Sequence, residues 1–290
     1  MSIPGPGGGP AEQDQGQLRS RDGTRIFYRR QAARGEKTRA RVLVVHGFAE
    51  HSGRYEHVLR GFSERGFDAW ALDLRGFGQS DGGRGCIRRW DEYLDDVQAL
   101  LECAARDRAT VPVFLVGHSM GGLVSTRFCE ERPSGLRGLL LSSPFFRVKM
   151  PVPVVKRAAA TVLSSLVPDL ALPTDMDPGL ISRDPEVVKA YVEDPLVLRK
   201  ATTRWFTEAM GAQARALADA PSLALPLLVI HGAADAIADP EASRRFFELA
   251  GAQDKTLRLW PELRHEILNE PEKQEVLAAF SEWIEKRLPA

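Results

Sequence analysis

The sequence lacks an excess of charge of either sign, because 39 Lys and Arg residues stand against 39 Asp and Glu in 290 residues. Proteins that bind duplex nucleic acid depend on many uncompensated basic side chains, so a nucleic-acid partner is not expected. Long hydrophobic runs are lacking too. The most apolar stretch, residues 150–173, is broken by Lys156, Arg157 and four prolines, and a membrane-spanning helix needs about 18 uncharged residues.

Cysteine is scarce, and this bears on location and on metal binding. The three cysteines, Cys86, Cys103 and Cys129, cannot all pair, and no two of them have metal-ligand spacing. We therefore expect a protein of the reducing cytoplasm without a metal centre. The first residues lack the basic start and apolar segment of a signal peptide, and their Gly, Pro and Gln content predicts a disordered tail over residues 1–17.

Short apolar runs alternate with helical patterns along the rest of the chain. The runs lie at 41–47, 67–76, 111–119, 136–144 and 226–232. Helical spacing of apolar residues occurs at 55–62, 88–108 and 276–284. Unbroken apolar strands separated by helices predict an α/β fold with a mostly parallel, doubly wound sheet covered on both faces. Before it, Asp22-Gly23 predicts a hairpin with a two-residue turn at the sheet edge.

One interval between two late strands is too long for a simple crossover. Residues 145–225 separate the apolar runs, and they contain Pro-punctuated helical segments. We expect a helical cap (lid) over residues 145–208, inserted into a core formed by 18–144 and 209–290. The carboxyl edge of an open α/β sheet binds ligands, so a cap laid there would shape the pocket.

The clearest chemical motif is Gly117-His118-Ser119-Met120-Gly121, which follows a strand run and precedes a helical one. Gly-x-Ser-x-Gly in this context is typical of the nucleophile elbow of the α/β-hydrolase fold. Its glycines allow a sharp turn that lifts Ser119 above the sheet. The Met120 amide would lie at a helix N-terminus, where it can stabilise an oxyanion.

A serine nucleophile requires a histidine base and an acid, which follow it in that fold in the order serine, acid, histidine. His231 and His265 remain as candidates, and His231 precedes any well-placed acid. The prediction is therefore His265 as base. Asp235 follows a strand end, whereas Asp239 precedes a proline and is typical of a helix N-cap, so Asp235 is the predicted acid.

A second oxyanion donor is expected from the loop after an early strand. His46 and Gly47 end such a strand, and the next residue is Phe48, whose amide is the predicted donor. His46 itself is interpreted as a residue that shapes this loop.

Seven segments together resemble the monoacylglycerol lipase family of α/β-hydrolases, in its bacterial form. They run from about residue 42 to the C-terminus and read HGFAEHSGRYEHV, LDLRGFGQSDG, GHSMGG, LSSP, SRDPEVVKAYVEDPLV, HGAAD and RHEILNEPE. The resemblance implies the triad Ser119, Asp235 and His265, an oxyanion hole from the Phe48 and Met120 amides, and a cap that admits one acyl chain. It implies hydrolysis of monoacylglycerols to fatty acid and glycerol through an acyl-enzyme, with no cofactor.

Several points stay open at this level. Glu50 and Arg54 either pair with each other or bind the glycerol hydroxyls. Phe48 is bulky where many relatives carry a small residue, and the segment 266–269 differs from the animal enzymes and resembles bacterial relatives. The preferred acyl length is therefore open. Lysophospholipids, short esters or N-terminal peptide bonds are alternative substrates, and a ligand-binding receptor with negligible turnover is a second alternative. The apolar segment 152–172 could contact a membrane surface peripherally or be a buried cap helix. The sequence indicates no oligomeric state.

Overall fold

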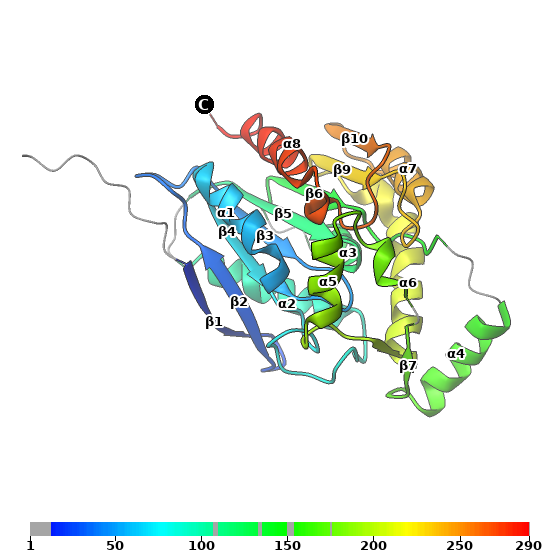
Figure 1. The fold of residues 1–290 in the computed structure, drawn as a ribbon. Coiled ribbons are helices and arrows are strands. Elements are labelled where there is room, and N and C mark those ends of the chain that lie inside the picture. The colour runs from blue at the N-terminus through cyan, green and yellow to red at the C-terminus, as the bar shows by residue number, and fades with distance from the viewer. Residues whose placement is uncertain (1–12, 107–109, 133–134, 150–153, 175, 290) are drawn as a thin grey trace, which may run out of the picture.

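The computed structural model describes residues 13–106, 110–132, 135–149, 154–174 and 176–289. Its central feature is an eight-stranded sheet in the order β1-β2-β4-β3-β5-β6-β9-β10 (Figure 1). β1 with β2 and β2 with β4 pair antiparallel, and all other neighbours pair parallel. These strands are β1 (Gln13–Arg19), β2 (Arg25–Gln31), β3 (Ala40–Val45), β4 (Phe67–Leu72), β5 (Val113–His118), β6 (Gly138–Ser142), β9 (Leu227–Gly232) and β10 (Lys255–Trp260).

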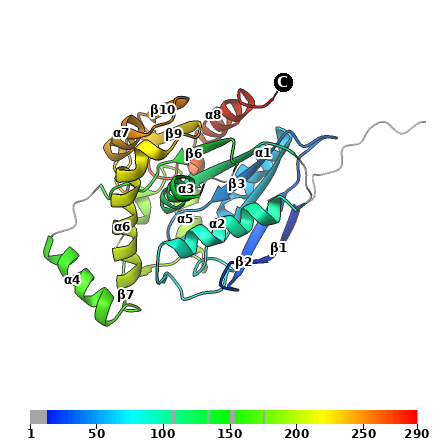
Figure 2. The same cartoon turned by 180° about the vertical axis from the view of Figure 1, so that it is seen from behind.

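Helices cover both faces of this sheet. Side chains alternate along each strand, so that Val42 and Val44 face one apolar layer and Leu43 and Val45 face the other. The first layer is closed by α1 (Glu56–Glu64) and α8 (Lys273–Glu285). The second is closed by α2 (Asp91–Ala104), α3 (Met120–Glu131), α6 (Thr203–Asp219) and α7 (Pro240–Leu249) (Figures 1 and 2).

The predicted α/β-hydrolase architecture is confirmed. Each of the five apolar runs contains a buried strand, and the three helical patterns correspond to α1, α2 and α8. The first pattern begins in a short 3-10 helix, η1 (Ser52–Tyr55), that precedes α1. The strands could be located as unbroken apolar runs because both faces of the sheet are buried, and the helices by their spacing because each buries one face.

Two expectations at the N-terminus are wrong. The disordered tail does not extend to residue 17, because β1 begins at Gln13 and pairs with β2 at seven positions; residues 1–12 lie outside the described part of the chain. The part of β1 before Leu18 is polar, as an edge strand can be, so the hydrophobic pattern did not detect it. The hairpin turn is longer than two residues, since Arg19 pairs with Arg25. Gly23 does adopt a φ of 88° there.

The insertion after β6 holds α4 (Val154–Leu166), α5 (Pro185–Glu193), a 3-10 turn η2 (Pro178–Leu180), and two short strands, β7 (Ala171–Pro173) and β8 (Lys200–Thr202), which pair antiparallel. The boundary drawn at 208 falls inside the continuous helix α6. The Ser164 and Thr207 hydroxyls lie 2.9 Å apart, so the start of α6 packs on α4. Its later residues Ala212 and Ala216 lie in the core layer. One helix therefore serves both parts.

The cap is bonded to loops at the carboxyl edge of the sheet. The Leu198 amide donates to the Ala49 carbonyl, and the Glu266 amide donates to the Ile181 carbonyl, both at 2.8 Å. The remaining short turns are η3 (Ala220–Ser222) and η4 (Ile267–Asn269). None of the helices in the described residues is long and apolar enough to cross a membrane.

Candidate active site

Ser119 lies on a strained turn between β5 and α3. Its φ of 52° and ψ of −118° are values that a residue with a side chain adopts only under constraint from its surroundings. Its amide donates to the Ser142 carbonyl at 3.0 Å, and its carbonyl accepts from the amides of Leu123 and Phe145. These bonds fix the turn at the carboxyl edge of the sheet.

Both flanking glycines are required by close contacts. A Cβ on Gly117 would lie 2.4 Å from the Gly121 carbonyl oxygen, and one on Gly121 would lie 2.2 Å from the Val45 carbonyl oxygen. Such distances are too short for any side chain. The elbow thus packs directly on the end of β3, where the next active-site loop begins.

The structure brings Ser119, His265 and Asp235 into one hydrogen-bonded chain. His265 lies on the loop between β10 and η4, and its Nε2 is 2.8 Å from Ser119 Oγ. Its Nδ1 is 2.7 Å from Asp235 Oδ2, which follows the end of β9. All three side chains are buried. The arrangement has the spacing that an imidazole requires to take a hydroxyl proton while a carboxylate fixes its tautomer.

The charged forms of Asp235 and His265 stabilise each other. Burial opposes charge on both groups, but the attraction and hydrogen bond between Asp235 and His265 outweigh it. They hold the pKa of the Asp235 carboxyl far below its usual range and raise the pKa of His265. His118, buried beside His265, has its pKa lowered to about 3 by burial and by that neighbour, so it stays neutral.

Asp239, the other acid weighed for this role, is also buried, with 7% of its surface exposed, but it makes no hydrogen bond to His265. Its Oδ1 accepts from the Glu241 amide at 3.2 Å, which makes it the N-cap of α7. It also forms ion pairs with Arg147 and Lys149. Its position therefore matches the interpretation as a helix cap.

The loop after β3 packs against the elbow. A Cβ on Gly47 would lie 3.1 Å from the Ser119 Cβ, so the chain carrying the Phe48 amide passes beside the serine. His46 shapes this loop as expected: its Nε2 accepts from the Leu74 amide at 2.9 Å, which leaves the proton on Nδ1, 2.7 Å from the Gly47 carbonyl. Met120 begins α3, where amides have no intrahelical acceptor.

The Phe48 ring packs among aromatic side chains, with its centroid 4.1 Å from that of Trp205 and 5.5 Å from that of Phe77. Trp205 belongs to the first turns of α6, beside the cap. The bulky residue at this position thereby joins the oxyanion loop to the helix that cap and core share.

Glu50 and Arg54 form a buried ion pair at 3.0 Å. Glu50 also accepts from the Gly47 amide at 2.7 Å and from the Tyr55 hydroxyl at 2.6 Å. Arg54 donates to both carboxylate oxygens of Glu266, and its guanidinium lies over the Tyr191 ring of α5 at 4.8 Å. This supports the structural interpretation of the pair, because every charge in it has a protein partner. A role in binding glycerol stays a prediction.

The sequence profile described as "Serine aminopeptidase, S33" matches residues 36–272, well over half of the chain. The chain belongs to this S33 family of α/β-hydrolases. The monoacylglycerol lipase of Mycolicibacterium smegmatis is 36% identical over 248 residues, covering 85% of this chain and 88% of the relative.

Two further proteins, one relative and one solved structure, are similar to this chain. The phospholipase YtpA of Bacillus subtilis is 32% identical over 82% of this chain and 92% of its own. The crystal structure of the Paleococcus ferrophilus monoacylglycerol lipase superposes with a TM-score of 0.83 and 33% identity, covering 90% of this chain and 99% of the other. The resemblance to monoacylglycerol lipases inferred from sequence motifs is thus confirmed.

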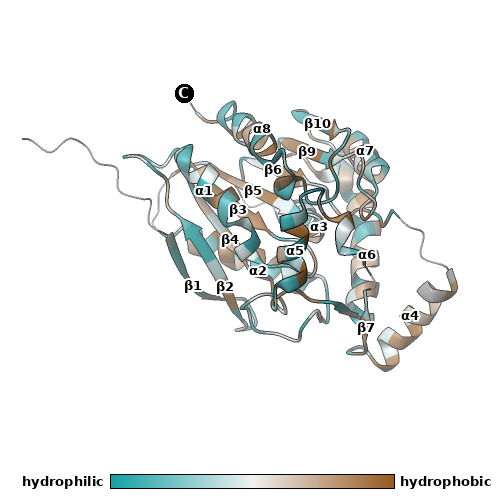
Figure 3. Cartoon of the chain, viewed as in Figure 1, coloured by the Kyte–Doolittle hydropathy of each residue, from teal (hydrophilic) through white to brown (hydrophobic). Residues whose placement is uncertain are grey.

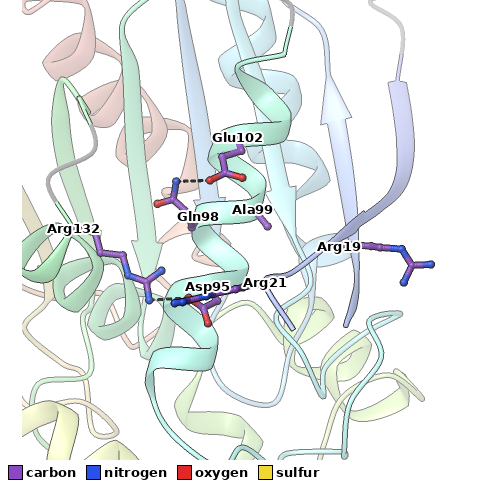
Figure 4. A pocket seen from close by; sticks show the side chains of 7 residues that line it. All are labelled: Arg19, Arg21, Asp95, Gln98, Ala99, Glu102 and Arg132. Carbon is purple, nitrogen blue, oxygen red and sulfur yellow. Dashed lines mark hydrogen bonds and ion pairs between the residues drawn. The ribbon is translucent and has the colours of Figure 1, made fainter. Parts of the chain in front are cut away.

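Two cavities among the described residues of this S33 member are not lined by the serine. One of about 440 Å³ is lined by residues of the β1–β2 turn, α2 and the end of α3, with Arg132 paired to Asp95 (Figure 4). Another of about 220 Å³ lies in the cap beside Tyr191. Ser119 itself is only 6% exposed, so the elbow is nearly closed to solvent in this conformation.

Sequence reasoning missed three partners in this site. Glu266 and Tyr55 complete the network around Arg54, and His231 contacts Asp235. Only Glu266 carried a local signal, an acid directly after the candidate base. In the part of the chain that the structure describes, no cluster of three His, Cys, Asp or Glu side chains could hold a metal ion.

Proposed function

We propose that this protein is a serine hydrolase that cleaves the ester bond of monoacylglycerols, with Ser119 as nucleophile, His265 as general base and Asp235 as the orienting acid. The observation that carries the proposal is the hydrogen-bonded chain from Ser119 Oγ through the His265 ring to Asp235, built on a turn with positive φ. Three residue types in this geometry have a defined chemistry, which is acyl transfer.

The reaction proceeds in two steps. His265 Nε2 removes the Ser119 proton as Oγ attacks the ester carbonyl, and the Phe48 and Met120 amides donate hydrogen bonds to the oxyanion. His265 then protonates the leaving glycerol oxygen, which leaves an acyl-enzyme on Ser119. A water molecule then attacks the acyl carbonyl as His265 takes its proton, and His265 returns that proton to Ser119 Oγ as the fatty acid leaves. Asp235 stabilises the imidazolium in each half-reaction and does not take its proton.

The monoacylglycerol substrate is supported by the relatives named above, two of which are monoacylglycerol lipases. A lysophospholipid is the second candidate, because another relative at 32% identity is named a phospholipase. The two substrates share a single acyl chain and differ in the polar head. If the polar head lies beside the Glu50–Arg54 pair, the charges there, which are paired within the protein, favour the uncharged glycerol head over a phosphate.

A head-to-head assay tests the substrate. We expect kcat/KM to be highest for a monoacylglycerol and lower for lysophosphatidylcholine and an aminoacyl arylamide, measured at the same pH on the same preparation. A higher value for lysophosphatidylcholine would overturn the choice of head group. A series of monoacylglycerols of increasing chain length then gives the acyl preference.

A receptor without turnover makes a different prediction. If the protein only binds its ligand, a fluorophosphonate would label Ser119 slowly and a simple ester would turn over at most once per molecule. We expect stoichiometric labelling and many turnovers, because the base lies 2.8 Å from the serine hydroxyl.

We further propose that α4 touches the lipid surface that supplies the substrate. Val155, Val162 and Leu166 share one side of this helix, at seven-residue and four-residue spacing, and are 80%, 58% and 74% exposed. Figure 3 shows the apolar colouring of α4 at the periphery of the molecule. An exposed apolar stripe on a helix is typical of peripheral contact with lipid.

The cytoplasmic location inferred from the cysteines stays a prediction.

A further inference from the structure

Asp235 holds two imidazoles on one carboxylate oxygen. Its Oδ2 lies 2.7 Å from His265 Nδ1 and 2.9 Å from His231 Nε2. Its Oδ1 accepts from the amides of Ile237 and Ala238 at 2.8 and 3.0 Å. Four donors therefore surround the carboxylate, which is the full number that two carboxylate oxygens accept.

His231 reaches Asp235 from the end of β9, four positions earlier in the chain, and its side chain is fully buried. Its other ring nitrogen, Nδ1, lies 2.8 Å from Ser243 Oγ on α7, which is also fully buried. A ring nitrogen that faces a carboxylate carries the proton. The ring in its uncharged form is therefore protonated on Nε2, and the Ser243 hydroxyl, which can donate or accept, donates to Nδ1. Ser243 thereby satisfies the second ring nitrogen of the tautomer that Asp235 requires.

We propose that His231 and Ser243 are positioning residues of the triad, which hold the Asp235 carboxylate in place and divide its negative charge between two rings. The inference rests on the proposed function, because both residues act through Asp235. It extends the chain of contacts beyond the three residues of the triad, from α7 through the end of β9 to the elbow.

The consequence for His265 has a defined sign. With His231 present, part of the charge on Asp235 Oδ2 is satisfied by the second N–H. Without that N–H the full charge acts on His265, whose ring also faces Glu266, Glu50 and neutral His118. The imidazolium form is then favoured, so the acid limb of the activity profile moves to higher pH. At the same time Asp235 loses one of its four anchors, and the base is held less firmly.

Three variants and one control separate this role from packing. His231→Leu removes the N–H, His231→Gln keeps an amide that can donate to Oδ2, and Ser243→Ala removes the hydroxyl that holds Nδ1 of the His231 ring. Ser281→Ala is the matched control, since Ser281 is a buried helix serine whose hydroxyl donates to the Leu277 carbonyl in α8. A p-nitrophenyl ester is the substrate, and fluorophosphonate titration counts the active sites.

We expect His231→Leu to lower kcat per titrated site by about 10- to 100-fold, the usual cost of losing a partner that orients a functional group, with little change in KM. Its acid limb should move to higher pH. His231→Gln should recover most of the rate, Ser243→Ala should lie between the parent and His231→Leu, and Ser281→Ala should match the parent. A packing role alone would reduce the number of titrated sites without moving the limb.

Two results would overturn the proposal. One is a His231→Leu variant with the kcat per site and the acid limb of the parent. The other is a His231→Gln variant no faster than His231→Leu at equal numbers of sites. If His231→Leu does not fold, equal rates for Ser243→Ala and Ser281→Ala overturn it instead. The ester probe reports any serine hydrolase, so a wrong choice of natural substrate would appear only in the lipid assay.

Discussion

Both carboxylate oxygens of Glu266 accept hydrogen bonds from Arg54, each at 2.7 Å. Glu266 directly follows the proposed base His265, and Arg54 also pairs with Glu50, which accepts from the Gly47 amide. One guanidinium thus joins the loop that carries the base to the loop that carries the proposed oxyanion donor. The two loops are far apart in the chain, and this buried bridge sets their relative position.

Removing the guanidinium should destabilise the protein. Arg54→Met leaves the Glu50 and Glu266 carboxylates buried without their common partner, and we expect the free energy of unfolding to fall by about 3–5 kcal/mol. Urea unfolding followed by circular dichroism measures this. Arg25→Met is the control, because the Arg25–Asp81 pair is exposed and should contribute far less. Equal losses for the two variants would contradict a bridging role.

The nucleophile makes the most direct prediction. Ser119→Ala should lower kcat on a monoacylglycerol at least roughly a thousandfold, since removal of a triad serine leaves only the oxyanion donors and binding. Thermal unfolding should still show a folded protein. A variant that hydrolyses the substrate at nearly the parent rate would contradict the assignment of Ser119 as the nucleophile.

The two neighbouring acids should separate clearly. Asp235→Asn removes the charge beside His265 and can present an N–H to it, and comparable changes in serine proteases lower kcat by about 10⁴-fold. Asp239→Asn keeps a good helix N-cap and loses only pairs with partly exposed cations, so its rate should stay close to that of the parent. Similar losses in kcat would mean that the acid is misassigned.

The midpoint of the acid limb of the activity–pH profile should lie above the usual pKa of histidine. Burial disfavours charge on His265, but Asp235 outweighs it and raises the pKa above the ordinary value of 6.5. The base must be neutral to take the Ser119 proton, so activity is lost as the pH falls through that raised value. A profile of kcat/KM against pH measures the limb. A limb centred below 6.5 contradicts the pairing.

Contact with lipid should depend on the exposed side of α4. Replacing Val162 and Leu166 together by Glu should weaken sedimentation with phospholipid vesicles, because the charges would have to enter the interface. Hydrolysis of a water-soluble ester should stay unchanged. Leu249→Glu, an exposed apolar position at the end of α7, is the control and should leave vesicle binding unaltered. Unchanged binding by the α4 variant would remove the proposed surface.

How far the sequence leads depends on whether a feature is local. The turn at Ser119 could be predicted because Gly117 and Gly121 act within two residues of it, and the strand before it is continuous and apolar. Glu50 and Arg54 are only four residues apart, with Glu50 in the loop before η1 and Arg54 within it, so their pairing could be weighed from the sequence. The bond from Arg54 to Glu266 spans 212 positions, and no spacing rule connects two residues that far apart in the chain. The start of β1 was missed because its residues before Leu18 are polar, and an edge strand can pair without an apolar face.

The sequence by itself determined the doubly wound sheet, the sharp turn at residue 119 and the order of the candidate residues. Strand burial, helix periodicity and the need for glycine each depend on residues that are close together in the sequence. Only the tertiary structure decided which side chains meet. Ser119 and His265 are 146 positions apart, and the parallel alignment of β5, β6, β9 and β10 brings their loops to one edge of the sheet. The same packing turned His231 toward Asp235, a contact that no spacing rule in the chain distinguishes from an ordinary buried histidine.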